Sequence, residues 1–461
     1  MSQQSTRYLR EMKTALLGDP DASLVFICNF EAEGEWGRGH IGLPGLPPTP
    51  KAPVVQRMEE LGALLAGPRD LLVLKQPLDE RYRRYAQGLG MALPAVAVPE
   101  NVRPDRSTTA DVLDSPRLMA RLRTLAAGGA LLMPMGTTAL EEKLADVCGI
   151  PLAVADAATF ERVNPKSYSR RITEEAGLRA VPGAVCETLG DLAGMLHGSR
   201  LMLISGLRLV VKDSYGVSGK GMIVLDTPPK MDRLLRMAER RARRTGDDRL
   251  EVVVEQWLDK RCDLNYQFTV APSGHVRLDF VKELLTEHGV HKGHLSPAGL
   301  TPAQRAEVEA AAQVVGARLH ADGFHGVAAC DAIVGTDGAV YPVLEINARL
   351  NMSSYQGAVT ELFQPPGHVA LARHYPMRLA RPAEFSAVRH ALDDAASGLG
   401  RVVVTCFGTV NAASGGRVPF EGRLYTMLVA ADRERLAALD NAAQAALSRL
   451  AAPSAPEPAG E

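Results

Sequence analysis

One short segment constrains the fold and chemistry of this chain more than any other. Residues 341–351 read YPVLEINARLN, and within them Glu345, Asn347 and Arg349 alternate with apolar residues. The side chains of a β-strand point alternately to its two faces. The pattern therefore predicts a strand with a carboxylate, an amide and a guanidinium on one face and apolar side chains on the other.

A second predicted strand lies just upstream, at residues 324–334, and contains Asp331. The GTDG sequence at residues 335–338 is typical of a hairpin turn. The hairpin would place Asp331 beside Glu345 on neighbouring strands. Their carboxylates and the amide oxygen of Asn347 would form a hard oxygen site suited to Mg²⁺. The alternative is an amphipathic edge strand whose polar face is only solvated.

A glycine-rich loop, DSYGVSGKG at residues 213–221, follows a predicted strand that ends at Lys212. Its backbone N–H groups could wrap phosphates, and Lys212 would pair with a phosphate as a point charge. The candidate phosphate-binding residues of the loop are Ser218, Gly219 and Gly221. The loop is not a P-loop or a dinucleotide fingerprint, because its order differs and a strand is predicted next, at residues 222–225. The alternative is a plain flexible hairpin.

A third polar segment, EQWL at residues 255–258, ends a predicted strand at residues 250–254. A purine site needs backbone donors and acceptors at the base edge and apolar walls around it. Residues 255–258 suit such a site. The alternative is simply the end of a strand.

Residues 1–160 are predicted to form an α/β domain with a parallel sheet, because buried-strand patterns alternate with helical patterns. The strand patterns lie at residues 24–29, 71–75 and 130–135, and the helical patterns at residues 51–65, 115–126 and 141–148. Residues 33–50 are rich in Gly and Pro and are predicted to be a loop, which either contacts substrate or only anchors packing.

A second domain is predicted at residues 161–375, starting with a helix that Asn164 caps and that has Pro165 in its first turn. Residues 376–450 are predicted to form a small C-terminal α+β unit. Residues 451–461 are rich in Ala, Pro and Glu and are predicted to be a disordered tail.

Composition argues against several classes of protein. The formal net charge of −1 over 461 residues lacks the basic footprint of nucleic-acid-binding proteins. No apolar run is long enough to span a membrane, and the polar N-terminus lacks a secretory signal. The six cysteines have no metal-ligand spacing, which favours reduced thiols in a cytoplasmic protein.

Taken in order, these segments resemble the ATP-grasp family of carboxylate–amine ligases over roughly residues 160–375. The resemblance rests on Lys166, the loop after Lys212, residues 255–258, Asp331 and residues 345–349. FICNFE at residues 26–31 and GTVNAA at residues 408–413 resemble segments of the pheganomycin-type peptide ligases. The implied fold is α/β (α+β): an N-terminal Rossmann-like pre-ATP-grasp domain, a two-lobed ATP-grasp fold and a small C-terminal α+β unit.

The resemblance also implies a role for each site residue. ATP would be held by Lys166, Lys212, Ser218, Gly219, Gly221, Glu255, Gln256, Leu258 and Asp263. Two Mg²⁺ ions, or Mn²⁺ as a substitute, would be held by Asp331, Glu345 and Asn347. Lys212 and Arg349 would act in catalysis, with Arg349 against the acyl phosphate or the tetrahedral intermediate. Asp331 departs from the family pattern, in which Glu is common, so the shorter side chain requires a closer strand.

The implied reaction joins a small amino-acid-like, nonproteinogenic carboxylate donor to the amino terminus of a peptide or amino-acid acceptor. It consumes ATP, passes through an acyl phosphate and belongs to antibiotic biosynthesis. The alternatives are a kinase on the same fold, a non-catalytic nucleotide-binding protein, and a carboxylase, which the lack of a biotin-carrier segment disfavours. A homodimer is expected. No general base is identified, and Lys282, His291 and Lys292 either face the ligands or are solvated.

Overall fold

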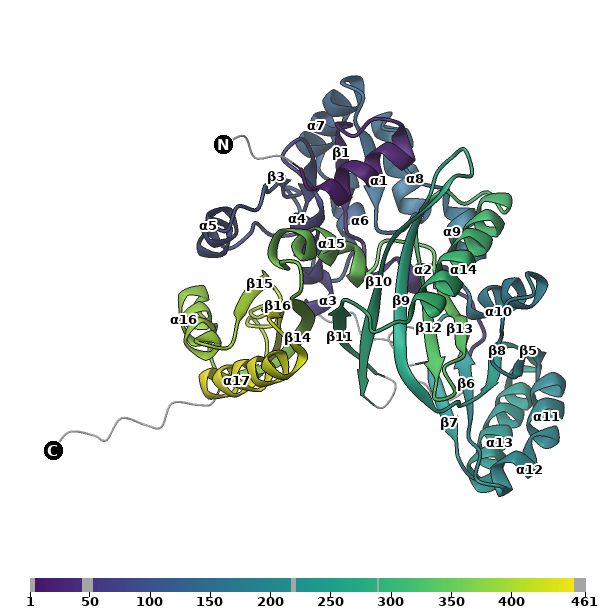
Figure 1. The fold of residues 1–461 in the computed structure, drawn as a ribbon. Helices are drawn as coiled ribbons and strands as arrows, with labels where there is room; N and C mark the ends of the chain where they lie inside the picture. The colour runs from purple at the N-terminus through teal and green to yellow at the C-terminus, as the bar shows by residue number, and fades with distance from the viewer. Residues whose placement is uncertain (1–4, 44–52, 217–220, 288–289, 452–461) are drawn as a thin grey trace.

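The computed structural model describes residues 5–43, 53–216, 221–287 and 290–451. Figure 1 shows three regions around a long central sheet: an N-terminal unit above it, a small antiparallel lobe at the lower right and the C-terminal elements at the lower left. In the described part of the chain, no helix is long and apolar enough to cross a membrane.

The N-terminal unit is built on a parallel four-stranded sheet of order β3-β2-β1-β4. Its strands are β1 (Leu24–Ile27), β2 (Leu71–Val73), β3 (Ala95–Ala97) and β4 (Leu131–Pro134). Its longer helices are α1 (Arg7–Leu17), α5 (Glu80–Gly88), α6 (Thr108–Leu113), α7 (Pro116–Ala127), α8 (Ala139–Cys148) and α9 (Ala157–Val163). Both faces of β1 are buried, since Leu24 and Phe26 join one apolar cluster while Val25 and Ile27 join another. This two-sided burial explains why the strands read as continuous apolar runs.

The helix predicted at residues 51–65 is wrong as a single element. Its described part is broken into α3 (Pro53–Arg57), a 3₁₀ turn η1 (Met58–Leu61) and α4 (Gly62–Leu65). Consecutive Glu59 and Glu60 are both buried there, which one apolar stripe on a regular helix does not provide. Their carboxylates accept hydrogen bonds from distant backbone N–H groups, Lys75 for Glu59 and Phe407 for Glu60.

The antiparallel lobe carries the glycine-rich loop. Its sheet has the order β5-β8-β6-β7, formed by β5 (Gly183–Thr188), β6 (Leu209–Asp213), β7 (Met222–Leu225) and β8 (Arg249–Gln256). Three helices contribute to its own apolar core: α11 (Leu189–Gly198), α12 (Arg200–Ile204) and α13 (Pro228–Thr245). The predicted strand after the glycine-rich loop is confirmed as β7, which pairs with β6.

The central sheet has eight strands in the order β13-β12-β9-β10-β11-β14-β16-β15. The strands are β9 (Lys260–Val270), β10 (Val276–Glu287), β11 (Val290–Ser296), β12 (Gly326–Gly335), β13 (Val340–Asn347), β14 (Val369–Leu379), β15 (Arg401–Cys406) and β16 (Phe420–Ala430). The helices of this part are α10 (Lys166–Glu175), α14 (Pro302–Ala321), α15 (Met352–Phe363), α16 (Phe385–Ala396) and α17 (Arg433–Ala451). The predicted boundary at residues 375/376 falls inside β14, so the C-terminal strands continue the same sheet. The division into domains otherwise stays a prediction.

The predicted cap of α10 is wrong. Asn164 ends α9 instead, and Pro165 occupies the position before α10. The Asn164 side chain accepts a hydrogen bond from the Ala348 N–H at 3.0 Å and donates one to the Phe160 carbonyl at 2.8 Å. It therefore ties the start of α10 to the segment that follows β13.

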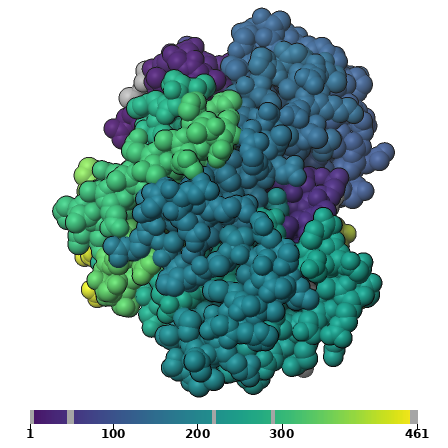
Figure 2. Space-filling model, turned by 90° about the vertical axis from the view of Figure 1, so that its right-hand side faces the viewer, coloured from purple at the N-terminus to yellow at the C-terminus, as the bar shows by residue number. Residues whose placement is uncertain are grey.

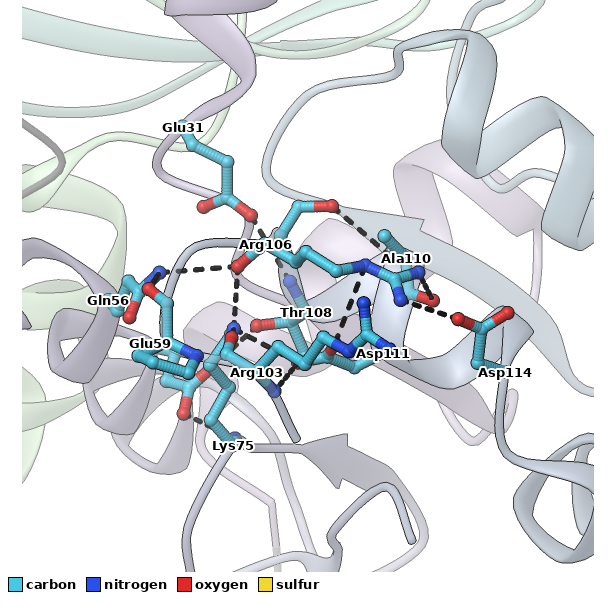
Figure 3. Close-up of polar contacts among 12 residues, drawn as sticks. Glu31, Gln56, Glu59, Lys75, Arg103, Arg106, Thr108, Ala110, Asp111 and Asp114 are labelled. Atoms are coloured by element: carbon cyan, nitrogen blue, oxygen red, sulfur yellow. Dashed lines mark hydrogen bonds and ion pairs between the residues drawn. The ribbon is translucent and has the colours of Figure 1, made fainter. Parts of the chain in front are cut away.

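A buried polar cluster lies near the carboxyl ends of the parallel strands (Figure 3). Glu59 accepts hydrogen bonds from the Lys75 N–H at 2.5 Å and from the Thr108 hydroxyl at 2.9 Å. The Lys75 ammonium lies 3.0 Å from the Asp111 carboxylate. Burial, opposed in part by Arg57, raises the pKa of Glu59 to about 8. The cluster joins α6 to the end of β2.

Candidate active site

A cavity of ≈ 300 Å³ lies between the antiparallel lobe and the polar face of the central sheet. It brings together ten of the predicted site residues: Lys166, Lys212, Glu255, Gln256, Leu258, Asp263, Asp331, Glu345, Asn347 and Arg349. Gly216 lines the cavity, whereas Gly221 packs behind it against Gly216. Ser218 and Gly219 lie outside the described residues.

The predicted hairpin is confirmed, and its register extends beyond the two strands. Asp331 on β12 pairs with Glu345 on β13, and on its other side with Asn265 on β9, which pairs with Lys282 on β10. Directly paired residues of an antiparallel sheet share a face. Glu345, Asp331, Asn265 and Lys282 therefore form one polar row across four strands. The sequence could not reveal Asn265 and Lys282 as its members, because they lie far away in the chain.

Amide groups orient the carboxylate of Asp331. The Asn265 side chain donates a hydrogen bond to it at 2.8 Å, and the Asn347 side chain donates one at 3.4 Å. Burial, and then the charge of Glu345, raise the pKa of Asp331. A divalent cation would relieve both effects. Two carboxylates and an amide oxygen, with room for phosphate oxygens, fit Mg²⁺.

Two lysines that line the cavity form ion pairs with its carboxylates. The Lys166 ammonium, at the start of α10, lies 2.9 Å from Glu345 and donates a hydrogen bond to the Gly216 carbonyl at 2.5 Å. The Lys212 ammonium lies 2.5 Å from Glu255. Both lysines are nearly buried, so the carboxylates balance charges that a polyanionic ligand could also balance.

Glu255 was expected to hold adenine, but its carboxylate contacts cations within the protein. It is buried and faces Lys212 and Arg170, the latter at 3.4 Å. The apolar part of the cavity is instead lined by Val181, Val210, Met222, Trp257, Leu258, Leu284, Ile333 and Leu344. In the sequence, only the EQWL segment at residues 255–258 pointed to this apolar wall, because its other residues come from separate strands.

A segment of the N-terminal unit holds the base of the glycine-rich loop. The Leu43 N–H donates a hydrogen bond to Asp213 at 2.8 Å, and a His40 ring nitrogen lies 3.3 Å from the same carboxylate. Burial raises the pKa of Asp213, but hydrogen bonds from His40 and the Leu43 N–H outweigh this effect, so that the pKa is lowered. Leu43 itself is buried in the apolar core of the antiparallel lobe. Figure 2 shows purple atoms of this part of the chain between the blue N-terminal unit and the teal lobe.

Several lining residues were missed or only placed in broad segments. The loop predicted at residues 33–50 is wrong at its start, because residues 33–36 belong to the helix α2 (Ala32–Trp36), from which Glu33 forms an ion pair with Arg349. Asn351 and Met352 also line the cavity, at the start of α15. Lys260 pairs with Asp263 at 2.6 Å. Lys282 was predicted either to face the ligands or to be solvated. It is not among the lining residues and it is buried, 3.2 Å from the Ser353 carbonyl, where burial lowers its pKa to about 7.

Family models match two parts of the chain. Residues 58–150 match a pre ATP-grasp domain, and residues 166–363 match the ATP binding domain of the carbamoyl-phosphate synthase L chain. The first match covers β2, β3 and β4 of the N-terminal unit, and the second covers the elements from α10 to α15.

Among curated proteins, the chain is similar to the [butirosin acyl-carrier protein]–L-glutamate ligase of Niallia circulans. The two are 27% identical over 201 residues, which cover 43% of this chain and 46% of the relative. The carbamoyl phosphate synthase large chain of Xylella fastidiosa is 23% identical over 36% of this chain and 15% of its own length. The chain thus matches less than half of the length of these curated relatives.

Solved structures share the fold. An N5-carboxyaminoimidazole ribonucleotide synthetase, determined with ADP, superposes with a TM-score of 0.54 at 11% identity, over 92% of this chain and 96% of the other. The N5-carboxyaminoimidazole synthase of Aspergillus clavatus gives 0.51 at 12% identity, over 92% and 99% of the two chains. The predicted fold class is therefore confirmed.

Proposed function

Because the chain carries a pre-ATP-grasp domain followed by an ATP-grasp domain, we propose that it is an ATP-dependent carboxylate–amine ligase. One observation carries the proposal: Asp331, Glu345 and Asn347 share a single cavity with Lys166 and Lys212. A nucleotide triphosphate needs cations for its phosphates and oxygen ligands for its metal, and the cavity offers both.

The adenine would lie against the apolar wall near residues 256–258, and the phosphates would extend toward Lys166 and Lys212. The loop after Lys212, with Ser218, Gly219 and Gly221, would cover the phosphates. When ATP binds, Lys166 would exchange Glu345 for a phosphate, which leaves the Glu345 carboxylate for a metal.

Asp331, Glu345 and Asn347 would hold Mg²⁺, and we propose two ions, with Mn²⁺ as a substitute. When bound, such ions neutralise phosphate charge and align the phosphate for transfer. Asn265 would keep the Asp331 carboxylate in place through its hydrogen bond. This contact positions the shorter Asp where the family commonly has Glu.

In the proposed reaction, an oxygen of the carboxylate donor attacks the γ-phosphorus of ATP. The bond between that phosphorus and the β–γ bridging oxygen breaks, and ADP leaves with the electron pair. The amine nitrogen of the acceptor then attacks the acyl carbon, phosphate leaves, and the amine loses a proton. Lys212 and Arg349 would stabilise the charges that develop. Exclusion of water protects the acyl phosphate from hydrolysis.

At finer detail, we propose a peptide ligase of natural-product biosynthesis. The donor would be a small, nonproteinogenic amino acid, and the acceptor the amino terminus of a peptide or an amino acid. The similarity to the butirosin-related ligase supports an amino-acid donor, since the name of that protein gives L-glutamate as its substrate. The expectations of a cytoplasmic location and a homodimer stay predictions.

The test measures release of ADP and phosphate from Mg-ATP with a panel of amino acids, with and without peptide amines. Glu345→Gln is compared with Glu187→Gln, which alters a carboxylate on β5 that is 64% exposed and outside the cavity. Release that needs both a carboxylate and an amine, and that only Glu345→Gln abolishes, supports the ligase. Transfer of phosphate to a stable product without an amine would favour a kinase. Tight ATP binding without turnover would favour a binding protein.

A further inference from the structure

The cavity contains one carboxylate to which the proposed reaction has so far given no task. Five carboxylates line the cavity, and each lies near a cation there. Asp331 and Glu345 would go to the metal, Glu255 lies between Lys212 and Arg170, and Asp263 is held by Lys260 and Thr286. Glu33 is left, and it forms an ion pair with Arg349, the residue expected at the acyl group.

Glu33 reaches the cavity from a different part of the chain than all the other lining residues. They lie between Lys166 and Met352, whereas Glu33 is on α2 (Ala32–Trp36), directly after β1. Trp36 anchors this short helix: it is buried, and its indole N–H donates a hydrogen bond to the Thr137 carbonyl at 2.9 Å. The Glu33 side chain is therefore held in place and remains 21% exposed toward the cavity.

The order of groups at this end of the cavity is informative. The Arg349 guanidinium donates a hydrogen bond to Asn347 at 2.8 Å and forms an ion pair with Glu33. Arg349 thus lies between the proposed metal ligands and Glu33. A donor whose carboxylate contacts Arg349 and the metal would present the substituent on its α-carbon to Glu33.

We propose that Glu33 and Arg349 form a recognition site for a zwitterionic α-amino acid, which is the carboxylate donor. Arg349 binds the carboxylate, and the Glu33 carboxylate accepts hydrogen bonds from a cationic nitrogen on the α-carbon. Binding replaces the Glu33–Arg349 ion pair by two ion pairs with the substrate. An acid without that nitrogen competes for Arg349 and offers the Glu33 carboxylate no cation in exchange, which disfavours its binding. The inference rests on the proposed function and names the residues that recognise its donor.

The test pairs α-amino acids with their desamino counterparts, such as phenylalanine with 3-phenylpropionic acid. The panel contains the proteinogenic amino acids and their desamino counterparts, and hydroxylamine serves as the amine, so that activation is read as hydroxamate and ADP. The wild type is expected to prefer the α-amino acids. Glu33→Gln is expected to lower kcat/KM for them roughly 10- to 150-fold, the effect of losing a hydrogen bond to a charged group. Glu33→Gln should lower kcat/KM for the desamino acids far less.

Glu35→Gln is the matched control, because Glu35 lies on the same helix and pairs with the exposed Arg38 outside the cavity. It should keep the wild-type preference, and Glu33→Asp should restore part of it. Binding of Mg-ADP, measured by calorimetry, should be unchanged in all three variants. Loss of that binding in Glu33→Gln would reject a local role.

Equal loss for amino and desamino acids in Glu33→Gln would overturn the inference. An increase in KM for a peptide acceptor alone, with hydroxamate formation unchanged, would also overturn it, because Glu33 would then serve the acceptor. If no acid supports ADP release by the wild type, the ligase proposal itself fails, and the inference with it. Selective use of desamino acids would reject only the inference.

Discussion

The buried carboxyl group of Glu59 should make the stability of the N-terminal unit depend on pH. Its side chain is fully buried beside Lys75 and Thr108, and its pKa rises from 4.5 to about 8 (Figure 3). The folded protein therefore holds this proton more tightly than the unfolded chain does. The free energy of unfolding should fall as pH rises from 4.5 through about 8, where the folded protein finally loses the proton.

The magnitude follows from the two pKa values. One pKa unit corresponds to about 1.4 kcal/mol. Between about pH 5.5 and about pH 8.5, the Glu59 carboxyl should remove about 3 kcal/mol of stability by the linkage relation. Glu59→Gln places an uncharged group of similar shape in the same site. As pH rises across this range, the free energy of unfolding of Glu59→Gln should therefore increase by about 3 kcal/mol relative to that of the wild type.

Chemical unfolding followed by tryptophan fluorescence would measure this shift. The chain has two tryptophans, and Trp36 lies in the N-terminal unit. In a Trp257→Phe background, the emission of Trp36 would report on that unit. Glu80→Gln is the control, because it makes the same substitution at an exposed position on α5 of the same unit. Parallel stability curves for wild type and Glu59→Gln across this pH range would refute the reasoning.

Three further predictions concern the cavity and its supports. Lys212→Met should weaken Mg-ATP binding roughly 10- to 150-fold, measured by calorimetry, because a hydrogen bond to a charged group is worth about 1.5–3 kcal/mol. Leu43→Ala should lower the free energy of unfolding of the antiparallel lobe by about 2–3 kcal/mol, measured by hydrogen exchange, because Leu43 is buried in the apolar core of that lobe. Unchanged protection of the lobe's amides would contradict the packing of Leu43 in that core. Lys282→Met should abolish a rise in stability above about pH 7, since burial lowers the pKa of Lys282 to about 7 and the unfolded chain binds the proton more tightly. Denaturant titrations at several pH values on both sides of about pH 7 would give the free energy of unfolding. If that free energy changes with pH equally in wild type and variant, Lys282 is not neutral in the folded protein.

The hairpin was predictable because all of its determinants are local. Alternation in residues 341–351 sets the face of each side chain, and the GTDG turn sets which strands pair. Register then brings Asp331 beside Glu345 without help from the rest of the chain. The loop after Lys212 was likewise readable, since a strand precedes it and another follows.

Other parts needed contacts that sequence spacing does not encode. The helix predicted at residues 51–65 breaks in the structure because Glu59 and Glu60 bind the backbone N–H groups of Lys75, which follows β2, and of Phe407, which follows β15. Asn164 looked like a helix cap, but it binds the Ala348 backbone, which is far along the chain. Local propensity is a weak guide where tertiary hydrogen bonds are available.

The sequence alone determined the strand pattern, the acidic hairpin and the two lysines, because each depends on residues that are close in the chain. Tertiary structure decided which distant residues complete the site. It placed Asn265 and Lys282 in the row of Asp331, since sheet order rather than spacing selects neighbours. It also brought Glu33 of the N-terminal unit against Arg349, because the packing of α1 and α4 of that unit on α15 is a property of two folded surfaces.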